Sequence, residues 1–411
     1  MYALAAALAF TVAALTSGHA DDDAPSGAAA AIAIPTSIAT SIAAPRPRDP
    51  DRNLFFGDAD LRPLVELERM QLASGAYQVG LEDGRTAVLT IDPALQARAE
   101  SVLQESEVPI GAIVVMSIDG RILALAGRKD GAKDPTGDVA LVPWAPAASV
   151  FKVVTSAALL AAGVAPDAEV CYHGGLRGID ESNLVDDPRV DGSCATFTFG
   201  LAKSQNAIIA KLAARHLDAH ALRQTAELFG FGRKPDFALP AEPSTATIPE
   251  AKLELAKTAA GFWNTQLSAV AGALLIDTVA TGGLAVTPRI VAGVIGRDGV
   301  ERGVLPTPAR RVLSAATAQA LGRMLIDTTE RGTAFSAFHD KKGRPLLDVE
   351  VAGKTGSLSR SDPYLHYSWF VGYAPADAPR MVVAAVLGNG LTWRVKAHTA
   401  ARLVLEQALA Q

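Results

Sequence analysis

The chain has 411 residues and a formal net charge of −5; 49% of its residues are hydrophobic and 20% are charged. These values describe a globular protein with enough core for one large or two modest domains. The acidic balance and the lack of a basic stripe argue against a surface built for polyanions, so we expect no nucleic-acid partner.

The first twenty residues, MYALAAALAFTVAALTSGHA, carry no Lys, Arg, Asp or Glu. They are apolar up to Leu15 and end in small residues, which predicts a signal peptide cleaved after Ala20 or an uncleaved membrane anchor within 1–19. The usual basic start is missing, and a buried Ala-rich helix is the alternative. No Cys follows, so we expect no lipid anchor. The expected location is the periplasm or the extracytoplasmic face of the inner membrane.

Composition divides the rest of the chain into three parts. Residues 21–52 are rich in Ala, Pro, Ser and Asp, which predicts a disordered linker. Residues 53–86 form an N-terminal extension in which 53–77 looks weakly helical. The folded domain is expected to occupy 87–411.

The first half of that domain shows three clear patterns. Asp92-Pro93 predicts a helix start, with Asp as N-cap and Pro in the first turn. Two apolar runs around Asp119-Gly120 predict a β-hairpin over 111–127. Residues 139–166 contain one charged residue, Lys152, in an apolar stretch that predicts a helix at the protein centre.

The second half is helical first and strand-rich afterwards. Residues 197–281 are mostly helical, and strand-like segments follow before a last helix at 397–410. This order predicts an α/β protein of the α+β kind, with an antiparallel sheet flanked by terminal helices and an all-helical lobe. The clearest segments are the helices 206–217 and 264–283 and the strands 347–356, 366–374 and 380–388.

The first motif of chemical interest is Ser149-Val150-Phe151-Lys152, an S-x-x-K sequence. Positions three apart share one face of a helix, so the hydroxyl and the amine can meet. Apolar surroundings lower the pKa of the lysine, and a neutral amine beside a serine hydroxyl is a general base beside a nucleophile. The alternative is a surface lysine, but residues 139–166 offer no second charge to mark a solvated face.

The second motif is Ser204-Gln205-Asn206, just before the predicted helix 206–217. Ser and Asn are favoured helix caps, and capping alone would explain the motif in isolation. In a catalytic interpretation, Ser204 passes a proton between nucleophile and leaving group, and the Asn206 amide holds the substrate backbone.

The third motif is Lys354-Thr355-Gly356-Ser357, which follows a predicted strand at 347–351. Gly356 allows another backbone to approach closely. Lys354 and the hydroxyls of Thr355 and Ser357 can bind a carboxylate, the lysine through a charge-assisted hydrogen bond. A strand that simply ends in a glycine turn is the alternative.

Together the motifs carry more information than each alone, because they occur once each and in the order S-x-x-K, S-x-N, K-T-G. In this respect the chain resembles the penicillin-binding transpeptidase domain of the serine D,D-peptidase and β-lactamase superfamily. The resemblance covers about residues 87–411. It extends to AVLTIDPALQARAESVL at the domain start, NTQLSAVAGALLIDTVATGG before the last third, and HYSWFVGYAPAD after the KTG strand.

The resemblance implies a role for each motif. Ser149 would form the acyl-enzyme with Lys152 as its base, and the backbone N–H groups of Ser149 and Ser357 would form the oxyanion hole. The substrates would be peptidoglycan stem peptides, and β-lactams would act as covalent inhibitors. No cofactor is expected. Ser204 and Asn206 would line the opposite wall, and the donor carboxylate would be bound by Lys354, Thr355, Gly356 and Ser357.

The chain also departs from the family pattern. It carries KTGS where KTGT is commoner, although Ser357 retains a hydroxyl. No glycosyltransferase domain is expected before residue 87.

Four other functions are weighed against a transpeptidase. A D,D-carboxypeptidase would use the same residues with water as acceptor. A class A β-lactamase needs an E-x-x-L-N motif between Asn206 and Lys354, and the nearest match, ESNL at 181–184, precedes Ser204. A non-catalytic sensor would not need all three motifs intact. A metalloenzyme is indicated only by His216 and His220, whose spacing fits a solvated helix face better.

The two cysteines, Cys171 and Cys194, leave three alternatives. In an exported protein a pair predicts one disulfide. Two free buried thiols, or a metal site that includes His173, are the other interpretations. We expect no metal.

Overall fold

The computed structural model describes residues 65–132, 136–176, 178–392 and 394–410. These residues belong to a compact unit, Asp49–Gln411. The predicted signal peptide or anchor at 1–20, the linker at 21–52 and residues 53–64 of the extension lie outside the described ranges. Within those ranges, no helix combines the length and apolar character needed to cross a bilayer.

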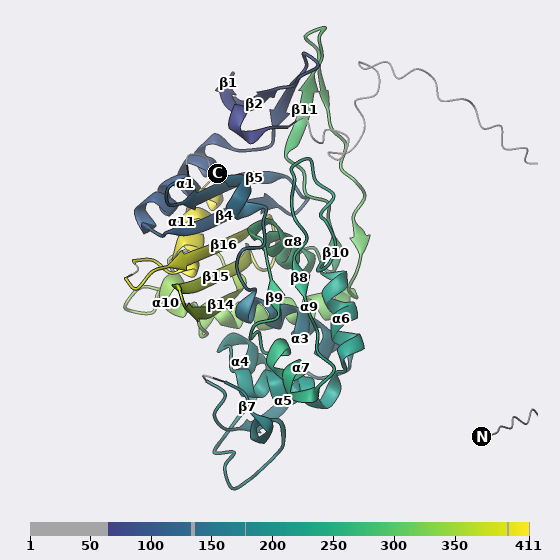
Figure 1. Cartoon of the computed structure of the whole chain (residues 1–411), viewed down its shortest axis with the longest axis vertical. Coiled ribbons are helices and arrows are strands. Elements are labelled where there is room, and N and C mark those ends of the chain that lie inside the picture. The colour runs from purple at the N-terminus through teal and green to yellow at the C-terminus, as the bar shows by residue number, and fades with distance from the viewer. Residues whose placement is uncertain (1–64, 133–135, 177, 393, 411) are drawn as a thin grey trace, which may run out of the picture. The chain divides into compact units, whose positions relative to one another are not determined.

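The central element is a five-stranded antiparallel sheet in the order β14-β15-β16-β4-β5 (Figure 1). Its strands come from both ends of the domain, because β16 pairs with β4 in a register that sets Met381 opposite Ser117. The predicted hairpin at 111–127 is confirmed as β4 and β5. The strands are β4 (Ile110–Ser117), β5 (Ile122–Lys129), β14 (Ala352–Ser361), β15 (Tyr364–Ala374) and β16 (Met381–Asn389).

Helices cover both faces of this sheet. On one face, α1 (Pro93–Ser106), α10 (Phe335–Phe338) and α11 (Ala397–Leu409) enclose a core with Phe370 and Val383 (Figure 1). On the other face, α8 (Ala269–Ala280) packs on β15, β16 and β4. The side chain of Asp92 caps α1 by accepting from the Leu95 N–H, as its sequence predicts. The predicted α+β architecture is therefore confirmed.

Most of the chain between β5 and β14 forms the helical lobe, in which short strands join the helices (Figure 1). Its elements are α2 (Thr136–Ala140), η3 (Ala148–Phe151), α3 (Lys152–Ala161), β6 (Glu169–Tyr172), η4 (Glu181–Leu184), β7 (Ser193–Thr196), α4 (Phe197–Ala202), α5 (Asn206–His216), α6 (Ala219–Leu228), β8 (Thr245–Ala246), α7 (Lys252–Ala259), β9 (Thr265–Gln266), β10 (Leu284–Ala285), β13 (Arg310–Arg311) and α9 (Ala315–Glu330).

A second five-stranded sheet combines the first strands of the described chain with two later ones, in the order β1-β2-β3-β11-β12. Residues 71–73 and 76–77 belong to its strands, so the weak helical prediction for 53–77 is wrong there, because strand pairing overrides local propensity. The predicted boundary at residue 87 falls inside β3. The elements here are η2 (Leu67–Arg69), β1 (Gln71–Ala73), β2 (Ala76–Gly80), β3 (Thr86–Leu89), β11 (Val291–Ile295) and β12 (Glu301–Gly303).

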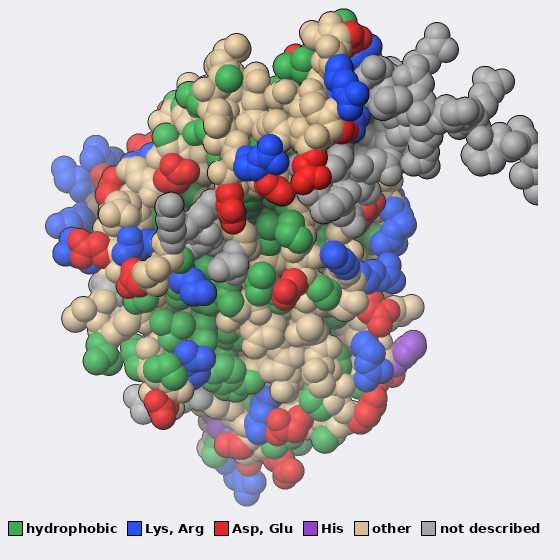
Figure 2. All heavy atoms as spheres, turned by 45° about the horizontal axis from the view of Figure 1, so that its top comes forward, with side chains coloured by type: hydrophobic (Ala, Val, Ile, Leu, Met, Phe, Trp, Pro, Cys, Tyr) green, Lys and Arg blue, Asp and Glu red, His purple; other side chains and the backbone are tan. Residues whose placement is uncertain are grey.

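Surface charge is mixed in sign. On the face drawn in Figure 2, acidic and basic side chains are interspersed, in keeping with the small net charge of −5.

Candidate active site

Ser149 lies in η3, a strained turn directly before α3. The residue before it, Ala148, has a positive φ of 49°, a conformation that costs energy for a residue with a Cβ. Gly261 lies directly behind this turn, and a Cβ added there would come within 2.9 Å of the Ser149 Cα. The absence of a side chain at Gly261 therefore leaves room for the turn at Ala148 and Ser149, which we call the nucleophile turn because Ser149 is the predicted nucleophile.

Lys152 is fully buried and reaches three oxygen atoms. Its Nζ lies 2.7 Å from the Ser149 Oγ, 2.7 Å from the Asn206 Oδ1 and 3.2 Å from the Ser204 Oγ. No carboxylate among the described residues forms an ion pair with it. The first and second sequence motifs thus meet at a single amine.

Burial lowers the pKa of Lys152 well below its ordinary value, and the nearby charge of Lys354 lowers it further. Burial also lowers the pKa of Lys354 to about 7. Lys152 is therefore poised as a neutral amine, while Lys354 can carry charge near neutral pH.

The S-x-N motif forms a turn between α4 and α5. Ser204 has a positive φ of 54°, and Gln205, rather than Ser204, occupies the N-cap position without a side-chain cap. Capping therefore does not explain the motif. The Asn206 amide is oriented at both ends, because its Oδ1 accepts from Lys152 and its Nδ2 donates to the Gly175 carbonyl at 2.9 Å.

The K-T-G motif lies within β14, the edge strand of the central sheet, and does not follow a strand at 347–351 as predicted. Residues 347–351 form bends and irregular structure, so the alternation of their side chains does not reflect a sheet. A Cβ at Gly356 would lie 3.2 Å from the Ala147 carbonyl oxygen, so the strand passes close to the nucleophile turn. Lys354 is buried and donates to the Thr355 carbonyl at 2.9 Å.

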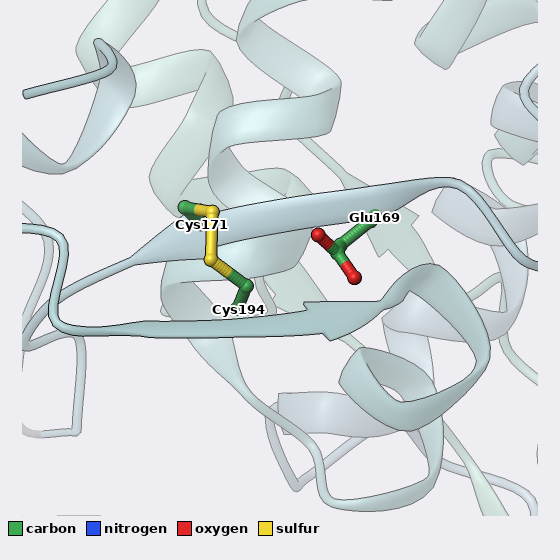
Figure 3. A group of neighbouring side chains, drawn as sticks. All are labelled: Glu169, Cys171 and Cys194. Carbon is green, nitrogen blue, oxygen red and sulfur yellow. A yellow bond between two sulfur atoms is a disulfide. The ribbon is translucent and has the colours of Figure 1, made fainter. Parts of the chain in front are cut away.

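Cys171 and Cys194 are joined by a disulfide and lie opposite each other on β6 and β7 (Figure 3). Glu169 lies close to the two sulfur atoms, but sulfurs joined in a disulfide do not offer the thiolates of a zinc site. The ring nitrogens of His173 contact Asp191 and Ser182, so His173 does not join the cysteines in a metal site. The disulfide closes the segment that carries Gly175, the partner of Asn206.

A buried ion network lies beneath this segment. Lys211 on α5 is fully buried and donates to the Cys171 carbonyl at 2.7 Å and to Asp191 at 2.9 Å. Burial acts to raise the pKa of Asp191, but hydrogen bonds from His173 and Lys211 outweigh it and lower that pKa. The network ties the disulfide-closed segment to the helix that begins at Asn206.

Two features outside the motifs do not add to the site. His216 ends α5 whereas His220 lies on α6, so their spacing of four does not place them on one helix turn. A cavity of about 410 Å³ lies among the end of α6, α8 and residues 307–310, and no motif residue lines it.

Several residues that shape the site were missed by sequence reasoning. Gly261 and Gly175 act through close backbone approach, and Thr333 lies 2.5 Å from Thr355, measured between the two Oγ1 atoms. Glycines in loops are too common to mark such contacts, and nothing in the sequence around Thr333 points to strand β14.

The family model for the penicillin binding protein transpeptidase domain matches residues 111–407. Peptidoglycan D,D-transpeptidase PbpA of Mycobacterium tuberculosis is 27% identical over 296 residues, which is 68% of this chain. The chain covers 58% of that relative, less than two thirds of its length.

Solved structures give the same picture. The imipenem acyl-enzyme complex of penicillin-binding protein A from M. tuberculosis superimposes with a TM-score of 0.66 at 26% identity, over 79% of this chain and 80% of that one. The D,D-transpeptidase domain of a peptidoglycan glycosyltransferase from Eggerthella lenta shares the fold, with a TM-score of 0.66 at 24% identity over 82% and 95% of the two chains. This chain belongs to the penicillin-binding protein transpeptidase domain family.

Proposed function

We propose that the chain is a serine D,D-transpeptidase that cross-links peptidoglycan stem peptides through an acyl-enzyme on Ser149. The observation that carries this proposal is the contact of 2.7 Å between the Ser149 Oγ and a fully buried lysine amine. A buried amine without a carboxylate partner is held neutral, and a neutral amine can take the serine proton.

The hydrogen bonds around Lys152 fit this role. A neutral amine has two N–H donors and one lone pair, which match two acceptors at Asn206 and Ser204 and one hydroxyl donor at Ser149. When the Ser149 oxygen attacks the carbonyl carbon of the penultimate D-Ala, its proton passes to Lys152. Ser204 then donates its proton to the leaving D-Ala nitrogen and receives the proton held by Lys152, as the C–N bond breaks and the Ser149 ester remains.

Binding groups are available on both sides of this centre. One N–H of the Asn206 amide is free of the Gly175 contact and can hold the substrate backbone. On β14, Lys354, Thr355 and Ser357 would bind the terminal carboxylate, with Gly356 leaving room beside the nucleophile turn. The backbone N–H groups of Ser149 and Ser357 would stabilise the oxyanion.

The cell wall lies outside the cytoplasmic membrane, so the proposed activity requires export. The apolar segment 1–20 and the Cys171–Cys194 disulfide support an extracytoplasmic location. β-Lactams are proposed as covalent inhibitors, in line with the imipenem acyl-enzyme of the M. tuberculosis protein.

The test is the mass of the purified protein after exposure to penicillin G. One drug should add per chain, on Ser149, and the adduct should be absent in Ser149→Ala. With a D-Ala-D-Ala stem peptide and an acceptor amine, the product should be the cross-linked peptide; free acid alone would identify a carboxypeptidase instead. Equal labelling of wild type and Ser149→Ala would contradict the proposal.

The lifetime of the adduct separates this function from that of a β-lactamase. In class A β-lactamases rapid deacylation uses a carboxylate base that holds a water, and a positioned base contributes about 100- to 10,000-fold. In the described part of the chain, no carboxylate is hydrogen-bonded to Ser149, Lys152 or Ser204. After excess drug is removed, the adduct should therefore persist for minutes to hours, and steady penicillin hydrolysis would contradict the assignment.

A further inference from the structure

Thr333 places a hydroxyl beside the third motif that the proposed mechanism does not use. Its Oγ1 lies 2.5 Å from the Oγ1 of Thr355, and either oxygen can be the donor. Thr333 is exposed, whereas Thr355 is largely buried. The contact therefore lies at the open side of the K-T-G strand, where a ligand carboxylate would approach.

The turn that carries Thr333 is held in place by its backbone. The Thr333 N–H donates to the Ala202 carbonyl at the end of α4, and the Ala334 N–H donates to Thr328 in α9. A Cβ at Gly332 would come within 2.6 Å of the Thr328 Cα, so this turn fits closely between the two helices. The position of the Thr333 hydroxyl thus depends on main-chain contacts and not on the side chain itself.

The chemistry of two adjacent hydroxyls sets what this contact can do. Each threonine has one O–H donor, and a carboxylate can only accept. If Thr355 donated to Thr333, its single proton would be unavailable to the ligand. If Thr333 donates to Thr355, the Thr355 proton is free to point at the carboxylate.

We infer that Thr333 is a positioning residue for carboxylate recognition: it donates to the Thr355 oxygen and thereby aims the Thr355 O–H at the terminal carboxylate of the donor peptide or β-lactam. This inference rests on the proposed function, because it assumes that Thr355 and Lys354 bind that carboxylate. It adds a residue from the turn that follows α9, which we call the α9 turn, to a site otherwise built from the three motifs.

The test compares two ligands and three variants by the rate of Ser149 acylation. Penicillin G carries the carboxylate, and its methyl ester does not. Thr333→Val removes the hydroxyl at nearly constant shape, and Thr333→Ser retains it. Thr317→Val makes the same change near the N-terminal end of α9, where the hydroxyl accepts from Ser314. Thr333→Val should slow acylation by penicillin G about tenfold.

The same variant should change acylation by the methyl ester by less than about twofold, and Thr333→Ser and Thr317→Val should match wild type with both ligands. Equal slowing of both ligands by Thr333→Val would overturn the inference, since it would indicate general support of the site. An unchanged rate with penicillin G would also overturn it. Wild type that is not acylated at Ser149 by either ligand would overturn both the proposed function and this inference.

Discussion

At the nucleophile, Lys152 is surrounded by three oxygen atoms from Ser149, Ser204 and Asn206, and its charged form is disfavoured by burial. Its proposed role is to take a proton, not to supply a positive charge. These two roles predict different outcomes for a substitution that keeps the charge.

Lys152→Arg should lower the rate of Ser149 acylation about as severely as Lys152→Ala, by about 100- to 10,000-fold. Arginine retains a positive charge but cannot release its proton at ordinary pH, so it cannot act as a base. The time course of the penicillin adduct by intact mass measures the effect. An arginine variant that acylates at nearly the wild-type rate would show that Lys152 acts through charge alone.

The pH dependence should report Lys354. Its pKa is lowered to about 7 by burial, so in the free enzyme it loses its charge as pH rises through about 7. The rate of acylation by penicillin G at low drug concentration should therefore decrease as the pH rises above about 7, which forms the alkaline limb of its pH profile. The profile for the methyl ester should lack this limb. Lys354→Arg keeps its charge and should remove the limb. An identical alkaline limb for both ligands would assign the titration to another group.

Individual residues differed in how far the sequence could identify them. The sequence predicted Ser149, Lys152, Ser204 and Asn206 as site residues because the expected chemistry requires specific residue types at short spacing. The structure brings these four residues together. Thr333 could not be found this way, since only the fold carries the α9 turn to β14.

Among the elements, the nucleophile turn depends on a glycine more than one hundred residues later in the chain. Gly261→Ala should slow acylation about 100-fold, because a displacement of about 1 Å at the nucleophile has that effect. Gly163→Ala is the matched control: both glycines have positive φ, but no atom lies within 4 Å of a Cβ at Gly163. The rate of penicillin adduct formation per folded molecule is the measurement. Equal rates in the two variants would rule out steric support by Gly261.

The sequence predicted a helix or strand well where one face of that element, or all of it, is buried in the protein. The pattern identified β15 and β16, which are buried on both faces along most of their length, and α11, whose buried residues recur at helical spacing. It failed at 347–351, where alternating side chains without a partner strand were interpreted as a strand. It also failed at β1 and β2, short strands in which β1 pairs with β2 and β2 pairs with β3. Pairing partners distant in sequence decide such segments, and local composition does not record them.

At the scale of the whole molecule, one buried acid should influence stability. Asp277 on α8 is fully buried, and neither carboxylate oxygen has a hydrogen-bond partner among the described residues. Burial, and secondarily the charge of Asp119, raise its pKa to about 8. The folded state thus holds a proton that the unfolded state releases near pH 4, so stability from this group is lost as pH rises from about 4 to about 8.

Asp277→Asn should flatten this dependence, which has a limiting slope of about 1.4 kcal/mol per pH unit. Thermal unfolding between pH 5 and pH 8 measures it, with Asp167→Asn as a control that removes a charge from an exposed position. If the asparagine variant loses as much stability over this range as wild type, Asp277 does not titrate as described.

The pairing of β16 with β4 also has a consequence for how the protein is made. Met381 lies opposite Ser117, so the central sheet cannot form until β16, at Met381–Asn389, has left the ribosome and can pair with β4. Until then the β4–β5 hairpin has an open edge, and contacts so distant in sequence form slowly. For a chain that we propose to be exported, this delay favours translocation. The polypeptide cannot complete its central sheet, and so can still pass through a translocation channel, until β14, β15 and β16 have been made.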